Sequence, residues 1–523
     1  MKICNMDKCE RDIYRNNDKC ILHCIKNDYQ KDRHSGLLSS FYNEFINYII
    51  EQVFKHRELL DDKYSKDEIA SYLKNSKFDK NKYNESLKKS IFIPSFIHFP
   101  KRDGRDTFDY LKILNLFGQI HFNYCEFYLS SLDLENVECF FQDCKFHDRW
   151  ILYDYGILKN EDNVIYQTCE FYETVSNYIP EEQKKLATYN YSQFEYTCKF
   201  HKNIEFNRVS FKDILFNTNQ YNDNKDNEIE NIIFDSCIFE KKFILNKYEI
   251  TNFEILNSNF KSKFEFKENS LNKFEINNSN FEKLVDFFGT EFKQFKIYKS
   301  IFDDFVVFEN CKFGTKDKKK EEIAIFKYAT FLDFINFRNS TFESGLDIEN
   351  INIKEAPNFL NINIEFQNTN RETFRIIKHS FDKINNYIEA NKYFVQEMKK
   401  YKEELKTKQL RGNIQEKIVF YINDYISSFA QNYFKPILWI IGFALLYCLI
   451  IYGYEQNWLY KIYPPINIYI EYFTDLLNSF AKNILPFSKF LKKGLEFISL
   501  IFYIIFSILI WQIIVSIKRN TKR

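Results

Sequence analysis

Residues 234–313 read FDSCIFEKKFILNKYEITNFEILNSNFKSKFEFKENSLNKFEINNSNFEKLVDFFGTEFKQFKIYKSIFDDFVVFENCKF, and this stretch decides the fold. Written in rows of 21 residues, its large apolar side chains fall into four columns. A period of about twenty residues with four inward positions is typical of a solenoid, whose coils bury their apolar faces only by stacking. The columns are Phe239, Phe260, Phe281 and Phe302; Phe234, Ile255, Ile276 and Ile297; Leu245, Phe266, Phe287 and Phe308; and Ile250, Leu271, Phe292 and Phe313.

A small residue stands two positions before many of these phenylalanines. Residues two apart on a strand point the same way, so the small side chain and the ring both enter the coil, and the pair fills a narrow interior without overpacking. Since Cys behaves as a small hydrophobe, we assign the cysteines from Cys125 to Cys311 to the core and not to catalysis. The pairs are Cys125 with Phe127, Cys144 with Phe146, Cys169 with Phe171, Cys198 with Phe200, Cys237 with Phe239, and Ser258, Ser279, Ser300 and Ser340 with the Phe two residues later.

The same grid extends in both directions, so the sequence predicts a mainly β solenoid over residues 113–353. It continues backward through Phe200, Phe206, Phe211 and Phe216, and forward through Phe326, Phe331, Phe337 and Phe342. Loops that leave a solenoid coil project from its surface and are the usual binding elements. Breaks in the register predict such insertions at about 148–165, 178–191, 217–230 and 314–321.

These [CSTA]-x-F units at five-residue steps resemble the pentapeptide repeat family. The resemblance implies a right-handed, roughly four-sided β-helix. The chain departs from the family pattern by one extra residue per coil, about 21 in place of 20, and by bulky side chains at nominally small positions, namely Phe243, Phe253, Phe264, Phe274 and Phe295. A wider and less regular β-solenoid is one alternative. A leucine-rich repeat is another, since FEILNSNF (253–260) fits L-x-L-x-x-N-x-L, but KFEFKENSL (263–271) keeps a strand-like alternation where a horseshoe needs a helix.

A cysteine cluster opens the chain. Within CNMDKCERDIYRNNDKCILHC, residues 4–24, the candidate ligands are Cys4, Cys9, Cys20 and Cys24, with His23 as the alternative fourth ligand. Two close pairs of soft ligands joined by a short loop suit a tetrahedral structural zinc ion. The spacing does not choose between His23 and Cys24. A closed set of four protein ligands leaves no position for water, so such a site in a module at residues 1–30 stabilises the fold and does not catalyse.

Composition and motifs argue against several classes of function. Lys and Arg total 73 and Asp and Glu total 72, so the overall charge does not favour nucleic acid. No apolar run of a signal peptide occurs in residues 1–26, which predicts a cytoplasmic N-terminal region with reduced thiols or metal-bound cysteines. The sequence contains no Walker loop, G-x-S-x-G, HExxH or kinase motif set, so we expect a protein that is not an enzyme.

Helical periodicity flanks the repeats. Residues 31–112 form a mainly helical N-terminal region, in which Phe41, Phe45, Ile46, Ile49, Ile50 and Val53 make an amphipathic stripe. After the solenoid, residues 370–410 predict an amphipathic helix pair, followed by a linker or juxtamembrane helix at 411–435. The predicted apolar faces of the pair are Phe374, Ile377 and Phe381, then Ile388, Phe394, Val395, Met398 and Tyr401.

Two uncharged runs at 436–454 and 497–517 are each long enough to cross a bilayer core of about 30 Å. Lys435 precedes the first, and a basic tail at 518–523 follows the second, which predicts two transmembrane helices with both chain ends in the cytoplasm. In the intervening loop, 455–496, apolar residues recur every three or four positions, as an interfacial amphipathic helix requires. They are Ile470, Phe473, Leu477, Phe480 and Ile484.

Cytoplasmic repeats followed by two spans resemble membrane-bound bacterial pentapeptide repeat proteins, which implies the bacterial inner membrane. Some of that group carry an ion-channel pore, but a potassium filter needs a Gly-rich run such as TVGYG, and the loop here reads SFAKNILPFSKF (479–490). We therefore expect a membrane-anchored interaction scaffold or sensor; the alternative is an ion channel or membrane-perturbing effector controlled by the solenoid. The expected partners are the lipid bilayer and an unknown protein, with a homo-oligomer as a further option and no nucleic acid.

Overall fold

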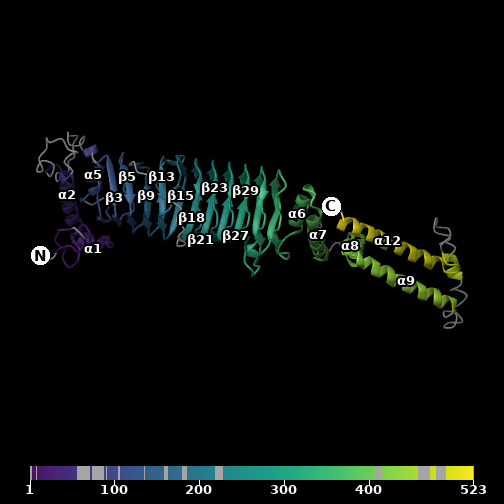
Figure 1. The fold of residues 1–523 in the computed structure, drawn as a ribbon. Coiled ribbons are helices and arrows are strands. Elements are labelled where there is room, and N and C mark those ends of the chain that lie inside the picture. The colour runs from purple at the N-terminus through teal and green to yellow at the C-terminus, as the bar shows by residue number, and fades with distance from the viewer. Residues whose placement is uncertain are drawn as a thin grey trace. The chain divides into compact units, whose positions relative to one another are not determined.

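The computed structural model describes residues 3–6, 9–55, 71–73, 87–89, 91–103, 107–134, 136–157, 163–179, 185–217, 228–407, 414–456, 472–478 and 491–521. The chain divides into two compact units, Met1–Thr369 and Asn370–Arg523. Figure 1 shows both units, with the chain coloured from purple at the N-terminus to yellow at the C-terminus.

The first unit is a parallel β-solenoid, as the 21-residue period predicts (Figure 1). Four of its eight-residue strands follow one another along the solenoid: β18 (Glu228–Asp235), β21 (Glu249–Leu256), β24 (Ser270–Asn277) and β27 (Glu291–Tyr298). They pair in parallel with a register that joins Phe234 to Ile255, Ile255 to Ile276 and Ile276 to Ile297. Four such strands, each eight residues long, make one wide face of the solenoid.

The other predicted columns are also in register. Phe239, Phe260, Phe281 and Phe302 pair in sequence along β19 (Ile238–Phe239), β22 (Asn259–Phe260), β25 (Asn280–Phe281) and β28 (Ile301–Phe302). The ring centroids of consecutive members lie 4.4, 4.8 and 4.9 Å apart. Stacking at one ring per coil therefore follows the spacing of neighbouring strands, about 4.8 Å.

The bulky phenylalanines at nominally small positions point inward as well. Phe253, Phe274 and Phe295 pair in register and are almost completely buried. Each lies two residues before a member of the Ile column, so both side chains of the pair enter the coil. Two large side chains of one strand fill the interior here, whereas pairs of one small and one large side chain fill it elsewhere.

The remaining strands form three further sheets and the rest of the largest one. The first sheet contains β1 (Ile91–Phe92), β3 (Gln119–Asn123), β5 (Glu138–Gln142), β9 (Val164–Gln167), β13 (Ser192–Glu195) and β17 (Phe216–Asn217), with β8 (Gly156–Ile157) beside β5. The second contains β2 (His98–Phe99), β4 (Glu126–Phe127), β6 (Lys145–Phe146), β10 (Glu170–Phe171) and β14 (Lys199–Phe200). The third contains β20 (Phe243–Ile244), β23 (Phe264–Glu265), β26 (Val285–Asp286), β29 (Val306–Val307) and β32 (Ile335–Asn336). The largest also includes β7 (Trp150–Leu152), β11 (Val175–Asn177), β12 (Ala187–Tyr189), β15 (Asn203–Asn207), β16 (Val209–Phe211), β30 (Lys312–Phe313), β31 (Ala324–Phe331), β33 (Thr341–Phe342), β34 (Leu346–Ile353) and β35 (Asn363–Ile364).

Parallel pairing begins earlier and ends later than residues 113–353. β1 pairs with β3 and β2 pairs with β4, so the segment from Ile91 to Phe99 belongs to the first coil. At the other end β35 pairs with β33. Pro94 and Pro100 lie outside these strands, so the segment contributes two edge strands despite its prolines.

Residues with left-handed backbone recur at two positions in successive coils. Asn257, Asn278 and Lys299 have the same φ of 49°, and each directly precedes a small inward residue. Asn tolerates this conformation better than most residues. On another corner the equivalent positions are Glu268, Gly289 and Asn310, with φ between 54° and 68°. These corner residues, which the apolar columns do not reveal, bend the chain from one face to the next.

The small inward residues also make hydrogen bonds between coils. Ser279 Oγ accepts from the Ser258 N–H at 3.1 Å and donates to the Asn277 carbonyl at 2.9 Å. The Cys237 thiol donates to the Phe206 carbonyl at 3.4 Å, so Cys takes the donor role in its coil. Cys125, Cys144, Cys169, Cys198, Cys237 and Cys311 are all buried, which confirms their assignment to the core.

Helices whose bounds the structure describes near the N-terminal coils are α1 (Tyr29–His34), α2 (Leu37–Lys55) and α5 (Tyr110–Leu114). The stripe on α2 is buried at Phe41, Phe45, Ile46 and Ile49, as its period predicts. The short 3-10 helix η2 (Lys320–Glu322) lies in the predicted insertion at 314–321, and its Glu322 carboxylate accepts from Thr315. The insertions at 148–165, 178–191 and 217–230 fall partly outside the described residues.

The second unit is helical. α6 (Arg371–Lys383) and α7 (Tyr387–Thr407) form the expected pair, with Phe374, Ile377 and Phe381 buried. Ile388 is exposed, contrary to its predicted place on the apolar face, because α7 presents Tyr393 to Phe381 instead.

Two long apolar helices follow α8 (Ile414–Ser427): α9 (Phe434–Glu455) and α12 (Glu496–Thr521). Both are long and apolar enough to cross a membrane. Tyr447 donates to Ser499 at 2.7 Å and Arg519 donates to the Phe429 carbonyl at 2.6 Å, so the two helices are antiparallel. Of the predicted interfacial helix only Phe473 and Leu477 lie within the described residues.

Candidate metal centre

The four side chains of the candidate metal centre come from two short segments. Cys4 follows an isolated antiparallel bridge between Ile3 and Asp12, which holds the first loop closed. Cys20 and His23 lie on a single turn, where the His23 N–H donates to the Cys20 carbonyl at 3.1 Å. Residues three apart on such a turn point to the same side, so the spacing of Cys20 and His23 brings both toward the first loop.

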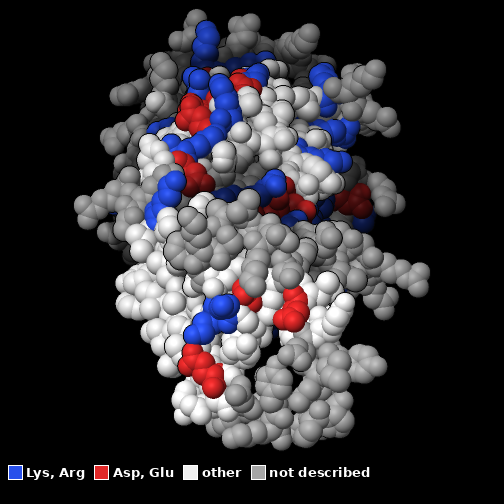
Figure 2. Space-filling model, turned by 90° about the vertical axis from the view of Figure 1, so that its right-hand side faces the viewer, with Lys and Arg blue, Asp and Glu red and all other residues white. Residues whose placement is uncertain are grey.

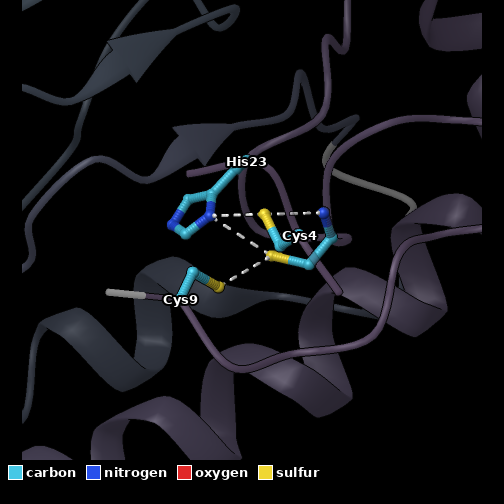
Figure 3. A group of neighbouring side chains, drawn as sticks. Cys4, Cys9 and His23 are labelled. Atoms are coloured by element: carbon cyan, nitrogen blue, oxygen red, sulfur yellow. Dashed lines mark hydrogen bonds between the residues drawn. The ribbon is translucent and has the colours of Figure 1, made fainter. Parts of the chain in front are cut away.

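Distances within the cluster match a tetrahedral zinc site. Zn–S bonds of about 2.3 Å and a Zn–N bond of about 2.0 Å place two sulfurs about 3.8 Å apart, and a sulfur and a nitrogen about 3.5 Å apart. The Cys9 and Cys20 sulfurs lie 3.8 Å apart. His23 Nδ1 lies 3.5 Å from Cys4 Sγ and 3.3 Å from Cys20 Sγ (Figure 3). All four ligand atoms lie within 4.8 Å of one another.

The pKa values of the cluster residues suit a bound cation, because thiolates buried here are unfavourable without a positive charge. Burial, reinforced by the charge of Lys26, lowers the pKa of His23 to about 4, so its imidazole is neutral and can bind a metal through Nδ1. Burial and the neighbouring Cys9 raise the pKa of Cys20 to about 12. In Cys4, hydrogen bonds from the Cys20 and Met6 backbone outweigh burial and lower the pKa. A divalent cation would supply the positive charge that thiolates at these positions require.

Cys24 lies outside the cluster. Its thiol is buried and donates to the Ile21 carbonyl at 3.6 Å. The sequence placed Cys24 in the ligand set with His23 as the alternative, and the described residues bring His23, not Cys24, together with Cys4, Cys9 and Cys20. The residues present therefore fit a Cys₃His zinc site, a closed set that would be structural.

The cluster is tied to the first coil of the solenoid. The His98 N–H, on β2, donates to the Leu22 carbonyl at 2.9 Å. Buried Lys26 donates to the Leu22 and Cys24 carbonyls and lies over the Phe41 ring of α2, 5.2 Å from its centroid. A metal that fixes the loop around Cys20 would thereby also fix the start of the solenoid.

A stack of aromatic rings on the outside of the N-terminal coils was not predicted from the sequence. Tyr128, His147, Tyr172 and His201 stack along the outside of successive coils, with ring centroids 4.5, 5.1 and 4.9 Å apart. His147 Nε2 lies 2.9 Å from Glu126, and His201 Nε2 lies 3.1 Å from Glu170. The signal was present in the alternating tetrapeptides CEFY (125–128), CKFH (144–147), CEFY (169–172) and CKFH (198–201). Each histidine of the stack is therefore paired with a glutamate of the solenoid, and these contacts stabilise the coil surface.

Comparison with protein-family models, curated proteins and solved structures gave no match to this chain.

Proposed function

We propose that the protein is a membrane-anchored, non-enzymatic scaffold or sensor, whose β-solenoid binds a protein partner in the bacterial cytoplasm while α9 and α12 cross the inner membrane. On this proposal the solenoid is right-handed, four-sided and of the pentapeptide repeat type. The single observation that carries it is a solenoid with a Phe-filled interior joined in one chain to an apolar helical hairpin. Because the interior is occupied by stacked rings, binding falls to the lateral faces.

The hairpin supports anchorage. Apolar side chains such as Leu438, Leu445 and Leu449 are exposed along α9, and Trp511 is exposed on α12. In Figure 2 the described surface of the hairpin is mostly white, with few charged side chains. A surface of this kind suits lipid far better than water. Lys435 at one helix and Lys518 and Arg519 at the other support cytoplasmic ends.

The wide face built by β18, β21, β24 and β27 supports protein binding. Its outward positions carry charges of both signs, in which Lys273 pairs with Glu254 at 2.5 Å and Lys296 pairs with Glu275 at 2.9 Å. Eight-residue strands at about 3.3 Å per residue make this face about 26 Å wide. A flat, mixed-charge surface of that size can hold a complementary partner with charge-dependent specificity.

The test is cross-linking mass spectrometry on the full chain in native membranes, comparing wild type with the charge-reversed double variant Lys273→Glu and Lys296→Glu. We expect cross-links from one protein partner to map to β21, β24 and β27, and to be lost in the variant. The double variant Lys241→Glu and Lys242→Glu, away from these strands, is the control that keeps them. Partner cross-links unaffected by the face variant contradict the assigned surface.

Planar-bilayer recording on the purified full chain tests the alternative of an ion channel or membrane-perturbing effector. The scaffold proposal predicts an unchanged bilayer conductance. Reproducible unitary currents, together with no partner cross-links to the solenoid, would contradict the scaffold function and support the ion channel.

A further inference from the structure

The short helix α8, between the α6–α7 pair and the first apolar helix, has an outer face made of apolar side chains. Ile418, Val419 and Ile422 are 51, 57 and 47% exposed, and Tyr425 follows three residues later on the same side. Residues at these spacings share one side of a helix. The described residues leave about half of the surface of Ile418, Val419 and Ile422 uncovered.

The inner side of α8 carries the polar groups. Ser427 Oγ donates to Gln512 Oε1 of α12 at 2.9 Å, and Gln512 Nε2 donates to Asn423 Oδ1 at 2.8 Å. Asp424 pairs with Lys402 of α7. A surface helix of a water-soluble protein turns its apolar side inward and its polar side to water. Helix α8 instead exposes apolar side chains, while its inner side holds these polar groups together with Phe420.

Two contacts place α8 beside the ends of the apolar helices. Gln512 lies seven residues before Arg519, which is about 10 Å along α12 at 1.5 Å per residue. Tyr425 packs against Trp439 of α9, with ring centroids 5.2 Å apart. Exposed Leu438 flanks Trp439 on α9, so the apolar outer face of α8 continues onto the first apolar helix.

We propose that α8 lies in the cytoplasmic interfacial layer of the bilayer, with Ile418, Val419 and Ile422 inserted among the acyl chains. This proposal rests on the proposed function, in which α9 and α12 cross the membrane. Lipid is the occupant because the face is continuous with the lipid-facing surface of α9 and because its polar side is already hydrogen-bonded to α12. Lys417 on α8 and Lys435 at the start of α9 lie where lipid phosphates would be, as charge complementarity requires.

Helix α8 thereby attaches the preceding helix pair, α6 and α7, to the membrane surface. Lys402 of α7 pairs with Asp424, and the Tyr401 ring contacts the Phe420 ring at 4.8 Å. Any movement of α7 relative to the membrane is consequently resisted by the insertion of α8.

Nitroxide accessibility on the full chain tests the position of α8. The variants are Ile422→Cys, Val419→Cys, Leu445→Cys on α9 and Lys399→Cys on the exposed side of α7, each in a Cys448→Ser background whose own signal is subtracted. Each is reconstituted in phosphatidylethanolamine and phosphatidylglycerol vesicles. The measured quantity is the ratio of collision rates with molecular oxygen, which concentrates among acyl chains, and with a water-soluble nickel chelate.

We expect the oxygen-to-nickel ratio to exceed unity at positions 419, 422 and 445 and to fall below unity at position 399. A ratio below unity at 419 and 422, with a lipid value at 445, overturns the interfacial position of α8 and leaves the membrane anchor intact. Labels at 419 and 422 that are shielded from both reagents, and whose spectra sharpen on dilution with unlabelled chain, assign the face to a second copy and also overturn it. A water value at 445 removes the proposed anchor itself, and the position of α8 falls with it.

Discussion

The ring of Phe281 lies parallel to that of Phe302 in the next coil, with centroids 4.9 Å apart and 5° between the ring planes. Phe281 has the same relationship to Phe260 in the preceding coil, at 4.8 Å and 2°. The Phe281 side chain thus packs against the coils on both sides of its own. A change at Phe281 is expected to be felt on both sides.

Phe281→Asp should locally unfold the neighbouring coils. Removing a buried Phe costs about 3–5 kcal/mol, and an unpaired buried carboxylate adds a desolvation penalty. Native-state hydrogen exchange on the full chain should lose protection in β22, β25 and β28 together. The control, Asn280→Asp, changes the adjacent exposed residue of the same strand and should leave exchange unaltered. Equal protection in both variants would show that Phe281 does not connect the coils.

Ser279 tests the hydrogen bonds between small inward residues. Ser279→Ala removes the acceptor for the buried Ser258 N–H, a loss of about 1–3 kcal/mol of local stability. Ser279→Cys should cost less, because Cys237 already occupies the equivalent position two coils earlier and its thiol bonds a carbonyl. Exchange rates at the Ser258 amide measure both. An alanine variant as protected as wild type contradicts a role for the hydroxyl.

Zinc content separates the two candidate fourth ligands. Elemental analysis of the purified full chain should give one zinc per chain for wild type and for Cys24→Ser, and a loss of zinc for Cys20→Ser and His23→Gln. The reason is that His23 Nδ1, and not the Cys24 thiol, lies with the other three ligand atoms. Zinc retained by His23→Gln and lost by Cys24→Ser would reverse the assignment.

Acid should destabilise the N-terminal end of the solenoid, beginning near pH 6.5. Burial lowers the pKa of His98, so the folded state keeps this side chain neutral while the unfolded chain binds a proton below its ordinary pKa of 6.5. The stability that neutral His98 permits is therefore full above pH 6.5 and is lost as the pH falls toward the lower folded pKa. In Glu126 burial raises the pKa, but hydrogen bonds from His147 and Tyr128 outweigh it and lower the pKa, which acts in the same direction.

The measurement is the pH dependence of exchange protection in β2 and β4. His98→Gln, which cannot titrate, should flatten the profile between pH 6.5 and the lower folded pKa. The exposed His34→Asn should not change it. Parallel profiles for wild type and His98→Gln would exclude His98 as the titrating group.

The apolar columns could be predicted because the 21-residue period and the two-residue alternation depend only on which side chains are apolar. The predicted solenoid range of 113–353 left out the coil at Ile91–Phe99, whose two strands are only two residues long and so show no alternation. The prediction also missed the left-handed corner at Asn257, since nothing in the apolar pattern marks backbone conformation.

For the metal centre, spacing identified the two loops but not the fourth ligand. Adjacent residues on one turn, His23 and Cys24, differ in direction and not in sequence distance, so only the three-dimensional arrangement separates them. The exposed apolar side of α8 was invisible for a related reason, because an amphipathic pattern shows that two faces differ but not which face meets the protein.

Sidedness of labelling tests the central claim, a cytoplasmic solenoid anchored by a membrane-spanning hairpin, most directly. Single cysteines replace partly exposed Lys261 on the solenoid and exposed Asp475, which lies between α9 and α12 in the sequence, with the unsubstituted full chain as the blank. A membrane-impermeant maleimide is applied to inverted and right-side-out vesicles. The account predicts that Lys261→Cys reacts only in inverted vesicles and Asp475→Cys only in right-side-out vesicles; reaction of both from the same side would contradict it.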